Sequence, residues 1–235
     1  MGDANRIHPT AVIGDDVVMG EGNVIGPHAV ILGPCRIGDN NWFGPHAGVG
    51  APGEFRGREH PSFDEPQGFG IVFGNGCVVR EFVTVQQGSY RDTAIGDDAY
   101  LMARSHVPHD AILEESVTLA CAAQIGGHGW VGVGANVGLG SQVVQRSAIG
   151  GLAMIGMNSS ITRDVPPFAL MMGAPARVKG VNRVGMSRAG IDDETIDRLE
   201  AYYGEGGREA PEWLPEELKV YFDRFSEFSQ RPVAK

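Results

Sequence analysis

Three residues that could act together in catalysis are separated by equal intervals. His109, Gly127 and Gln145 lie 18 positions apart along the chain. A neutral histidine can take a proton from a hydroxyl or an amine, and a glycine N–H can stabilise an oxyanion. Asp110 directly follows His109, and His128 directly follows Gly127. We therefore interpret His109 as a candidate general base, Gly127 as a candidate oxyanion donor and Asp110 as a candidate orienting carboxylate.

The interval of 18 has a structural meaning because the chain carries a six-residue repeat. Large apolar residues recur every six positions from Ile7 to Val49 and, after an interruption, from Ile95 to Ile161, and a mostly small residue sits four positions after each. An amphipathic α-helix would space its apolar residues by three or four. A period of six fits short strands joined by turns, three to a coil of a triangular solenoid. Residues 18 apart then stack in one column, ~4.8 Å from coil to coil.

The repeat predicts an all-β parallel β-helix over residues 1–180, with a loop excursion at 51–70. That stretch is rich in Gly, Pro and charge and breaks the period, and residues 86–94 form a smaller interruption. The series stops at Asp164–Pro167, where two prolines are expected to end regular pairing.

Residues 181–235 predict a C-terminal helical region. Asp192 is suited to cap one helix, and Pro215 to start a second. Apolar residues follow each start at spacings of three and four: Ile196, Leu199 and Tyr203 in the first, and Leu218, Tyr221, Phe222, Phe225 and Phe228 in the second.

Composition narrows the classes of function. The net charge of −10 argues against a nucleic-acid backbone as the main partner. The 35 glycines indicate many tight turns. Cys35, Cys77 and Cys121 form no CxxC pair and are interpreted as free thiols of a reducing compartment. The chain shows neither a secretory signal nor an apolar run of ~18 residues. We expect a cytoplasmic protein without a membrane span.

The histidines leave two other interpretations open. Four of them lie in turns or in the first loop and are interpreted as structural: His8, His28, His46 and His60. The same structural role is one alternative for His106, His109 and His128. A second alternative is a zinc site shared between subunits, as in the β-helical carbonic anhydrases, because these three side chains supply three nitrogen ligands.

One stretch of the chain resembles a known family. The residues LMARSHVPHDAILEESVTLACAAQIGGHGWVGVGANVGLGSQVVQ, followed by DVPP and GVNRVGMSRAG, resemble the UDP-N-acetylglucosamine O-acyltransferases of lipid A biosynthesis. The resemblance covers nearly the whole chain and is specific from about Ile95 to Gly190. It implies a left-handed β-helix, a homotrimer with sites between adjacent subunits, and an acyl donor carried on acyl carrier protein, with no bound cofactor and no metal.

The resemblance also implies roles for residues on the acyl-transfer side. His109 matches the general base of the family, and Asp110 matches its neighbour in the HxxHD motif. His106 matches the first histidine of that motif. Gly127 matches the residue whose N–H binds the oxyanion, and His128 matches a histidine that contacts the substrate.

Other matches concern the acceptor and the acyl chain. Gln145 matches a glutamine in the acceptor region, and Asn182 and Arg188 match residues that contact the nucleotide, where an arginine suits a phosphate. Met157 falls where the family places the residue that limits acyl length, so we expect a short-to-medium acyl group. The alternative for Met157 is a core methionine that fills space.

The departures from the family pattern lie on the acceptor side. The I-H-R-G-T stretch of the family reads V-Q-Q-G-S here, so Gln86 stands in place of a histidine and is a candidate substrate-binding residue. Val144 replaces a second histidine, and Val184 replaces a glutamate that contacts the nucleotide. The Q-D-L-K-Y segment is absent from residues 51–70. These changes favour conserved acyl transfer with altered acceptor recognition.

The combined expectation is an acyltransferase. It would move a short-to-medium acyl group from an acyl-carrier-protein thioester to a hydroxyl or amine of a nucleotide sugar resembling UDP-N-acetylglucosamine. The alternatives are a coenzyme A-dependent acyltransferase of specialised metabolism with a non-nucleotide acceptor, a zinc lyase or hydratase on the same fold, and a non-catalytic trimeric scaffold. Acyl carrier proteins are acidic, so a local basic patch is expected, with candidates at Arg80, Arg91, Arg104 and residues 177–179.

Overall fold

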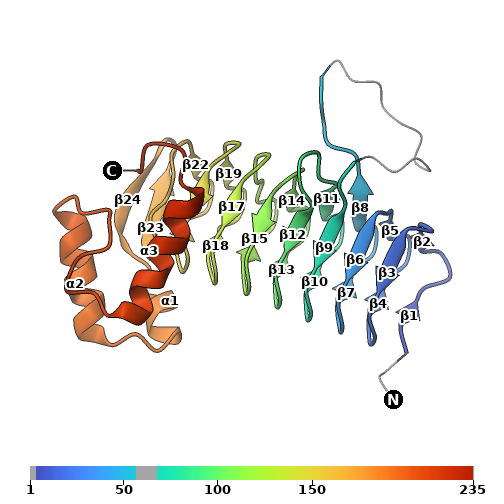
Figure 1. Cartoon of the computed structure of the whole chain (residues 1–235), viewed down its shortest axis with the longest axis horizontal. Coiled ribbons are helices and arrows are strands. Elements are labelled where there is room, and N and C mark those ends of the chain that lie inside the picture. The colour runs from blue at the N-terminus through green and yellow to red at the C-terminus, as the bar shows by residue number, and fades with distance from the viewer. Residues whose placement is uncertain (1–3, 57–67, 235) are drawn as a thin grey trace.

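The chain winds into a triangular prism of stacked coils (Figure 1). The computed structural model describes residues 4–56 and 68–234. Three strands make most coils, and most strands pair in parallel with the strand one coil further on. Tyr100 pairs with Thr118 and Ile112 with Trp130, for example, both 18 residues apart. The predicted left-handed parallel β-helix is confirmed.

The described strands form the three faces of the prism. The first face holds β1 (Arg6–Ile7), β4 (Val24–Ile25), β7 (Trp42–Phe43), β10 (Val78–Val79), β13 (Tyr100–Leu101), β16 (Thr118–Leu119), β18 (Asn136–Val137), β21 (Met154–Ile155), β23 (Ala169–Gly173) and β24 (Ala176–Val181). The second face holds β2 (Val12–Ile13), β5 (Val30–Ile31), β8 (Gly48–Ala51), β11 (Thr84–Gln86) and β14 (His106–Val107), and continues through bridges at Gln124 to β19 (Gln142–Val143) and β22 (Ser160–Ile161). The third face holds β3 (Val17–Met19), β6 (Cys35–Ile37), β9 (Ile71–Phe73), β12 (Thr93–Ile95), β15 (Ile112–Leu113), β17 (Trp130–Val131) and β20 (Ala148–Ile149).

The six-residue repeat fills the interior as predicted. Leu101, Val107 and Leu113 are buried inside the prism, one from each face. The small residues four positions later, such as Ser105 and Ala111, are buried where the wall turns. The residues beside each buried small residue therefore lie on the outside of the prism edge, at a fixed position along the prism axis.

The coil at residues 71–86, between the two interruptions, was not included in the predicted series of apolar residues, which resumed only at Ile95. Phe73, Val79 and Val85 carry the same six-residue spacing and are buried in the interior. The strands β9, β10 and β11 join the coils on either side without a gap in pairing. The prism is therefore continuous through residues 71–86.

The six-residue repeat does stop at Asp164–Pro167, where paired residues are 16 positions apart, but the prediction that regular pairing ends there was wrong. Val165 bridges Ile149, and β23 pairs in parallel with β21. Pro167 precedes Phe168, which has a positive φ of 63°, so the prolines sit in a corner. Such a corner position needs no N–H for the ladder, so proline is tolerated there. The last coil then turns back as an antiparallel hairpin of β23 and β24.

Three helices follow in the described part of the chain, α1 (Arg183–Arg188), α2 (Asp193–Gly204) and α3 (Glu216–Phe228). The side chain of Asp192 accepts a hydrogen bond from the Thr195 N–H at 2.9 Å, which confirms the predicted cap of α2. α3 begins after Pro215, also as predicted. α1 was not predicted. None of the described helices is long and apolar enough to cross a membrane.

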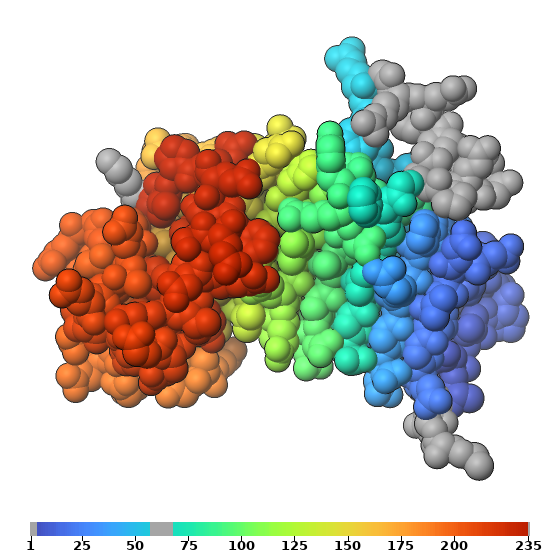
Figure 2. All heavy atoms as spheres, in the orientation of Figure 1, coloured from blue at the N-terminus to red at the C-terminus, as the bar shows by residue number. Residues whose placement is uncertain are grey.

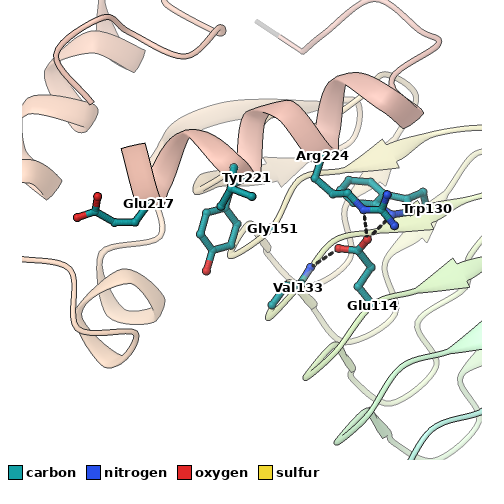
Figure 3. A pocket seen from close by; sticks show the side chains of 8 residues that line it. Glu114, Trp130, Val133, Gly151, Glu217, Tyr221 and Arg224 are labelled. Atoms are coloured by element: carbon teal, nitrogen blue, oxygen red, sulfur yellow. Dashed lines mark hydrogen bonds and ion pairs between the residues drawn. The ribbon is translucent and has the colours of Figure 1, made fainter. Parts of the chain in front are cut away.

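The helix α3 packs on the third face of the prism (Figures 1 and 2). The ring of Phe228 stacks on Trp130, with centroids 4.9 Å apart and planes inclined by 3°. Arg224 Nε contacts Glu114 Oε1 at 2.6 Å, and Glu114 also accepts from the Trp130 indole (Figure 3). Tyr221 lies against Gly151, where a side chain would collide with its ring. The C-terminal region is thereby fixed beside the corner that carries His128.

Candidate active site

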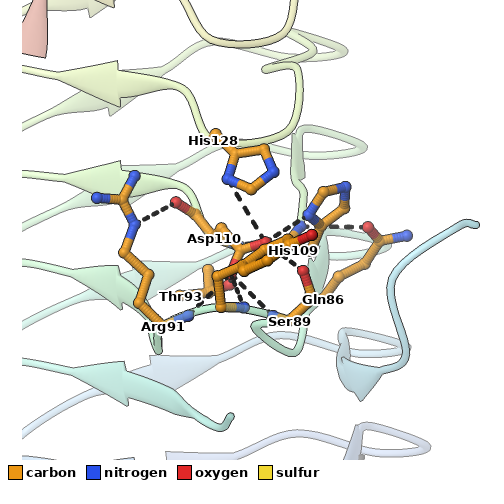
Figure 4. A network of polar contacts seen from close by, with 8 residues as sticks. Gln86, Ser89, Arg91, Thr93, His109, Asp110 and His128 are labelled. Atoms are coloured by element: carbon orange, nitrogen blue, oxygen red, sulfur yellow. Dashed lines mark hydrogen bonds and ion pairs between the residues drawn. The ribbon is translucent and has the colours of Figure 1, made fainter. Parts of the chain in front are cut away.

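A buried carboxylate organises the corner between β14 and β15. Asp110 is fully buried and has a positive φ of 61°. It accepts hydrogen bonds from the Ser89 N–H at 2.8 Å, the Ser89 hydroxyl at 2.6 Å, the Tyr90 N–H at 2.7 Å and the Arg91 N–H at 3.1 Å (Figure 4). The Asp110 N–H in turn donates to Thr93 Oγ1 at 2.9 Å. The segment that interrupts the repeat at residues 86–94 is therefore held in place by hydrogen bonds from residues 89–91 to the Asp110 carboxylate.

These bonds decide the charge of Asp110. Burial raises its pKa, but hydrogen bonds from the Ser89 hydroxyl, from His109 and from backbone N–H groups outweigh burial and hold the pKa well below its usual range. The carboxylate is consequently ionised at neutral pH.

His109 is oriented by this carboxylate. Its Nδ1 lies 2.7 Å from Asp110 Oδ2, and its side chain is 15% exposed. An ionised acceptor requires Nδ1 to carry the proton, which leaves a lone pair on Nε2. Nε2 faces Gly127 one coil away, where a Cβ would come within 2.7 Å of it. The absence of a side chain at Gly127 keeps the basic nitrogen of His109 uncovered.

The N–H of Gly127 is available to a ligand. Within residues 4–56 and 68–234 it donates to no acceptor. In three earlier corners the same turn position is occupied by Pro9, Pro27 and Pro45, so the fold does not use an N–H there. Gly127 thus brings a free donor to the edge that also presents His109 Nε2, which is the pairing that stabilises an oxyanion beside a base.

His128 completes the cluster. Its ring meets that of His109 edge to face, with centroids 5.0 Å apart, and its Nδ1 lies 3.7 Å from Asp110 Oδ2 (Figure 4). Burial lowers the pKa of His128, and nearby Arg146 acts in the same direction while Asp110 opposes it. His128 is therefore neutral at neutral pH and is able to donate or accept a hydrogen bond at the same edge.

His106 has a different position from His109. It lies on the second face, and its Nδ1 is 2.7 Å from Thr84 Oγ1. Burial lowers its pKa, whereas the charge of Glu54 raises it. Among the described residues the cluster with potential metal ligands is His109, Asp110 and His128, so His106 does not complete the three-histidine set within one chain.

The two glutamines take unequal places. Gln86 is 5% exposed, and its amide oxygen accepts from the His109 N–H at 3.3 Å. Gln145 occupies the expected column one coil beyond Gly127, but it is exposed, and the contact made there is from Arg231 Nε to its backbone oxygen at 3.1 Å. Gln86 therefore holds the backbone of His109 from the buried side, whereas the side chain of Gln145 lies exposed on the prism edge.

The remaining predicted site residues lie elsewhere in the chain. Asn182 caps α1 through the Gly185 N–H at 3.0 Å and donates to the Leu152 carbonyl at 2.8 Å. With Arg188 it lines a groove of about 960 Å³ beside the first face, away from the His109 corner. Met157 is 62% exposed on the corner between β21 and β22, so it is not a core methionine in this chain.

Several residues of the site escaped sequence reasoning. Ser89 binds Asp110 from a segment that breaks the repeat, and Phe55 places its ring 4.6 Å from that of His109. Tyr90 lies 5.7 Å from His128, ring to ring. Phe55 comes from the described start of the first loop; His60 in the same loop lies outside the described residues.

Comparisons with known proteins agree with this architecture. A family model described as UDP N-acetylglucosamine O-acyltransferase, domain 2, matches residues 164–208, and one for bacterial transferase hexapeptide repeats matches residues 1–33. The acyl-[acyl-carrier-protein]–UDP-N-acetylglucosamine O-acyltransferase of Burkholderia lata is 37% identical over 143 residues, 60% of this chain and 54% of the relative. The enzyme of the same name from Synechocystis is 37% identical over 131 residues, 55% of this chain and 48% of the relative.

A solved structure extends the likeness to the whole fold. The UDP-N-acetylglucosamine acyltransferase from Campylobacter jejuni superimposes with a TM-score of 0.79 at 28% identity, over 97% of this chain and 99% of the other. The matched region spans about half the length of the curated relatives. Taken with the hexapeptide-repeat prism and its C-terminal helices, these matches show that the chain is similar to the UDP-N-acetylglucosamine O-acyltransferases in sequence and in fold.

Proposed function

We propose that this protein transfers an acyl group from an acyl-carrier-protein thioester to a hydroxyl or amine of a nucleotide sugar. The activities after which its relatives are named support the donor and the class of acceptor. One observation of the chain itself carries the proposal. His109 Nδ1 is tied to a buried carboxylate, and Nε2 opens onto Gly127, whose N–H has no acceptor within the described residues.

The reaction follows from this arrangement. The acceptor hydroxyl gives its proton to His109 Nε2 as its oxygen forms a bond to the thioester carbonyl carbon. The Gly127 N–H stabilises the oxyanion of the tetrahedral intermediate. Asp110 stabilises the imidazolium through Nδ1–H. When the C–S bond breaks, the leaving thiolate takes the proton from Nε2, so the histidine returns to its neutral form. No covalent acyl-enzyme is formed.

We infer a homotrimer with sites between adjacent subunits. The groove beside Asn182 and Arg188 lies on the first face, whereas His109 lies between the second and third faces. Packing prisms side by side allows the groove of one subunit to approach the His109 edge of the next. Sedimentation at several concentrations tests this arrangement, and a monomer at micromolar concentration would contradict it.

The acceptor pocket is proposed to differ from that of the relatives. Gln86, in place of a histidine, is buried behind His109. Met157 stands exposed on a corner where a bulky side chain shortens any channel that passes it. We therefore propose a short-to-medium acyl group.

A panel of thioesters and acceptors tests the function. Acyl-carrier-protein and coenzyme A thioesters of graded chain length are offered with several nucleotide sugars, and products are identified by mass spectrometry. The proposal expects transfer from the carrier-protein donor, without added zinc and in the presence of a chelator. Transfer only from coenzyme A, or only with stoichiometric zinc, would contradict it.

A further inference from the structure

A second pocket adjoins the active-site edge on the side of the third face. It has a volume of about 390 Å³. His128 and Arg146 line it from the prism, Arg91 lines it from the segment that binds Asp110, and Phe228 lines it from the end of α3. The pocket therefore shares His128 with the catalytic cluster and has no lining residue in common with the groove beside Asn182.

Two buried aspartates build the opposite walls of this pocket. Asp110 holds residues 89–91 through their N–H groups. Asp164, also fully buried, accepts from the Ser229 hydroxyl at 2.9 Å and from the N–H groups of residues 230 and 231 at 2.9 and 2.8 Å. Asp110, His128 and Arg146 follow one another at intervals of 18, so they occupy one column of the prism edge, whereas Asp164 lies in the next coil in register with Ala148. Asp164 therefore holds residues 229–231 in place in the same way that Asp110 holds residues 89–91.

The pocket is positively charged. Arg91 is fixed by a bond from its Nε to the Asp110 carbonyl at 3.1 Å. The guanidinium of Arg146 has no hydrogen-bond or ion-pair partner in the part of the chain that the structure describes. Glu227 also lines the pocket and its carboxylate contacts Arg224 at 2.6 Å, but the two arginines of the lining outnumber this one carboxylate. Both Arg91 and Arg146 help to lower the pKa of His128, so their charges reach the catalytic edge.

We propose that this pocket is a phosphate subsite for a substrate, with Arg146 and Arg91 as the ligands and His128 as the link to the reacting centre. Guanidinium groups bind phosphate oxygens through paired, charge-assisted hydrogen bonds. The inference rests on the proposed function in one respect, namely which substrate supplies the phosphate. Two sources share this chemistry: the diphosphate of a nucleotide-sugar acceptor and the phosphodiester of the pantetheine arm of the donor.

Phosphate binding is tested without turnover. The imidazole resonances of His128 are followed by NMR in protein with labelled histidine as inorganic phosphate is added. Arg146→Gln should weaken the phosphate-dependent shift of His128 about tenfold in apparent Kd, and Arg146→Lys should recover part of it. Arg6→Gln, which makes the same charge change on β1 at the other end of the prism, should have no effect (Figure 1). Equal phosphate binding in Arg146→Gln and the parent, or no shift in the parent, would overturn the subsite.

Kinetics then identify the source of the phosphate. In Arg146→Gln the KM for one co-substrate should rise about tenfold while kcat changes by less than threefold. A rise for the acceptor assigns the subsite to its diphosphate, and a rise for the donor assigns it to the pantetheine arm. Unchanged KM values for both would overturn its role in substrate binding. If no acyl transfer occurs with any pair of substrates, the proposed function fails, while the NMR result still decides whether phosphate binds.

Discussion

Adding one methyl group at Gly127 tests the geometry of the active site. In Gly127→Ala the new Cβ would lie 2.7 Å from His109 Nε2 and 2.8 Å from Cε1. Ordinary contact begins near 3.5 Å, so the two groups must separate by roughly 0.8 Å. The imidazole is held by its 2.7 Å bond to Asp110 and by the ring of Phe55 at 4.6 Å. It can retreat only by disturbing those contacts.

The expected loss is kinetic. A displacement of this size, together with a methyl group where the acceptor hydroxyl must approach, should reduce kcat by ~10²-fold, equivalent to about 2.7 kcal/mol of barrier. Gly127 has no positive φ that would forbid alanine, and its N–H is retained. The fold should therefore survive with a loss of about 1–3 kcal/mol in unfolding free energy.

The assay and its control separate these effects. Acyl transfer is followed by mass spectrometry well below the melting temperature, and unfolding is followed by calorimetry. Gly204→Ala serves as the control, because a Cβ at Gly204 on the last turn of α2 meets nothing within 4 Å. Wild-type turnover in a folded Gly127→Ala protein would refute the assignment of the His109 Nε2 edge as the reacting site.

Other substitutions test separate parts of the structure. Asp110→Asn should cost about 3–5 kcal/mol of unfolding free energy in urea titrations, because the buried charge is lost and an amide NH₂ would replace Oδ2, which now accepts from the Ser89 hydroxyl and from His109 Nδ1–H. The depressed pKa of Asp110 means that its stabilisation is complete above the unfolded pKa of about 3.9 and is lost as pH falls through the folded pKa. The difference between Asp110→Asn and the parent should thus stay constant from about pH 5 to 8 and shrink in stronger acid; a difference that grows in acid would reverse the sign. Phe228→Ala should lower stability by about 1–3 kcal/mol through loss of the stack on Trp130, and an unchanged melting temperature would show that α3 docks by other contacts. Met157→Gly should shift donor preference toward longer acyl chains in a competition assay, and unchanged preference would remove Met157 from the acyl path.

Periodic features of this protein are readable from the sequence because each repeat obeys the same physical constraint. The interior accepts one large apolar residue every six positions, so the column that joins His109 to Gly127 follows by counting. The helix caps at Asp192 and Pro215 are local signals and were read in the same way. In each of these cases the determining residues lie close together or at a fixed spacing.

Contacts without a fixed spacing could not be predicted. Ser89 reaches Asp110 from 21 residues away, and Ser229 reaches Asp164 from 65 residues away. Neither distance is a multiple of the coil, because both segments have left the regular prism. The short helix α1 was missed for a related reason, since six residues carry little periodicity and its cap, Asn182, also bonds Leu152 in the prism.

Acyl transfer by the His109→Ala protein tests most directly whether His109 is the general base. The purified chain and this variant are compared with an acyl-carrier-protein thioester and a nucleotide sugar, and the acylated product is quantified by mass spectrometry. We predict product with the parent protein and a rate reduced by ~10²-fold or more in a variant with an intact fold and assembly. Near-normal transfer by His109→Ala would contradict the proposal that His109 Nε2 is the base.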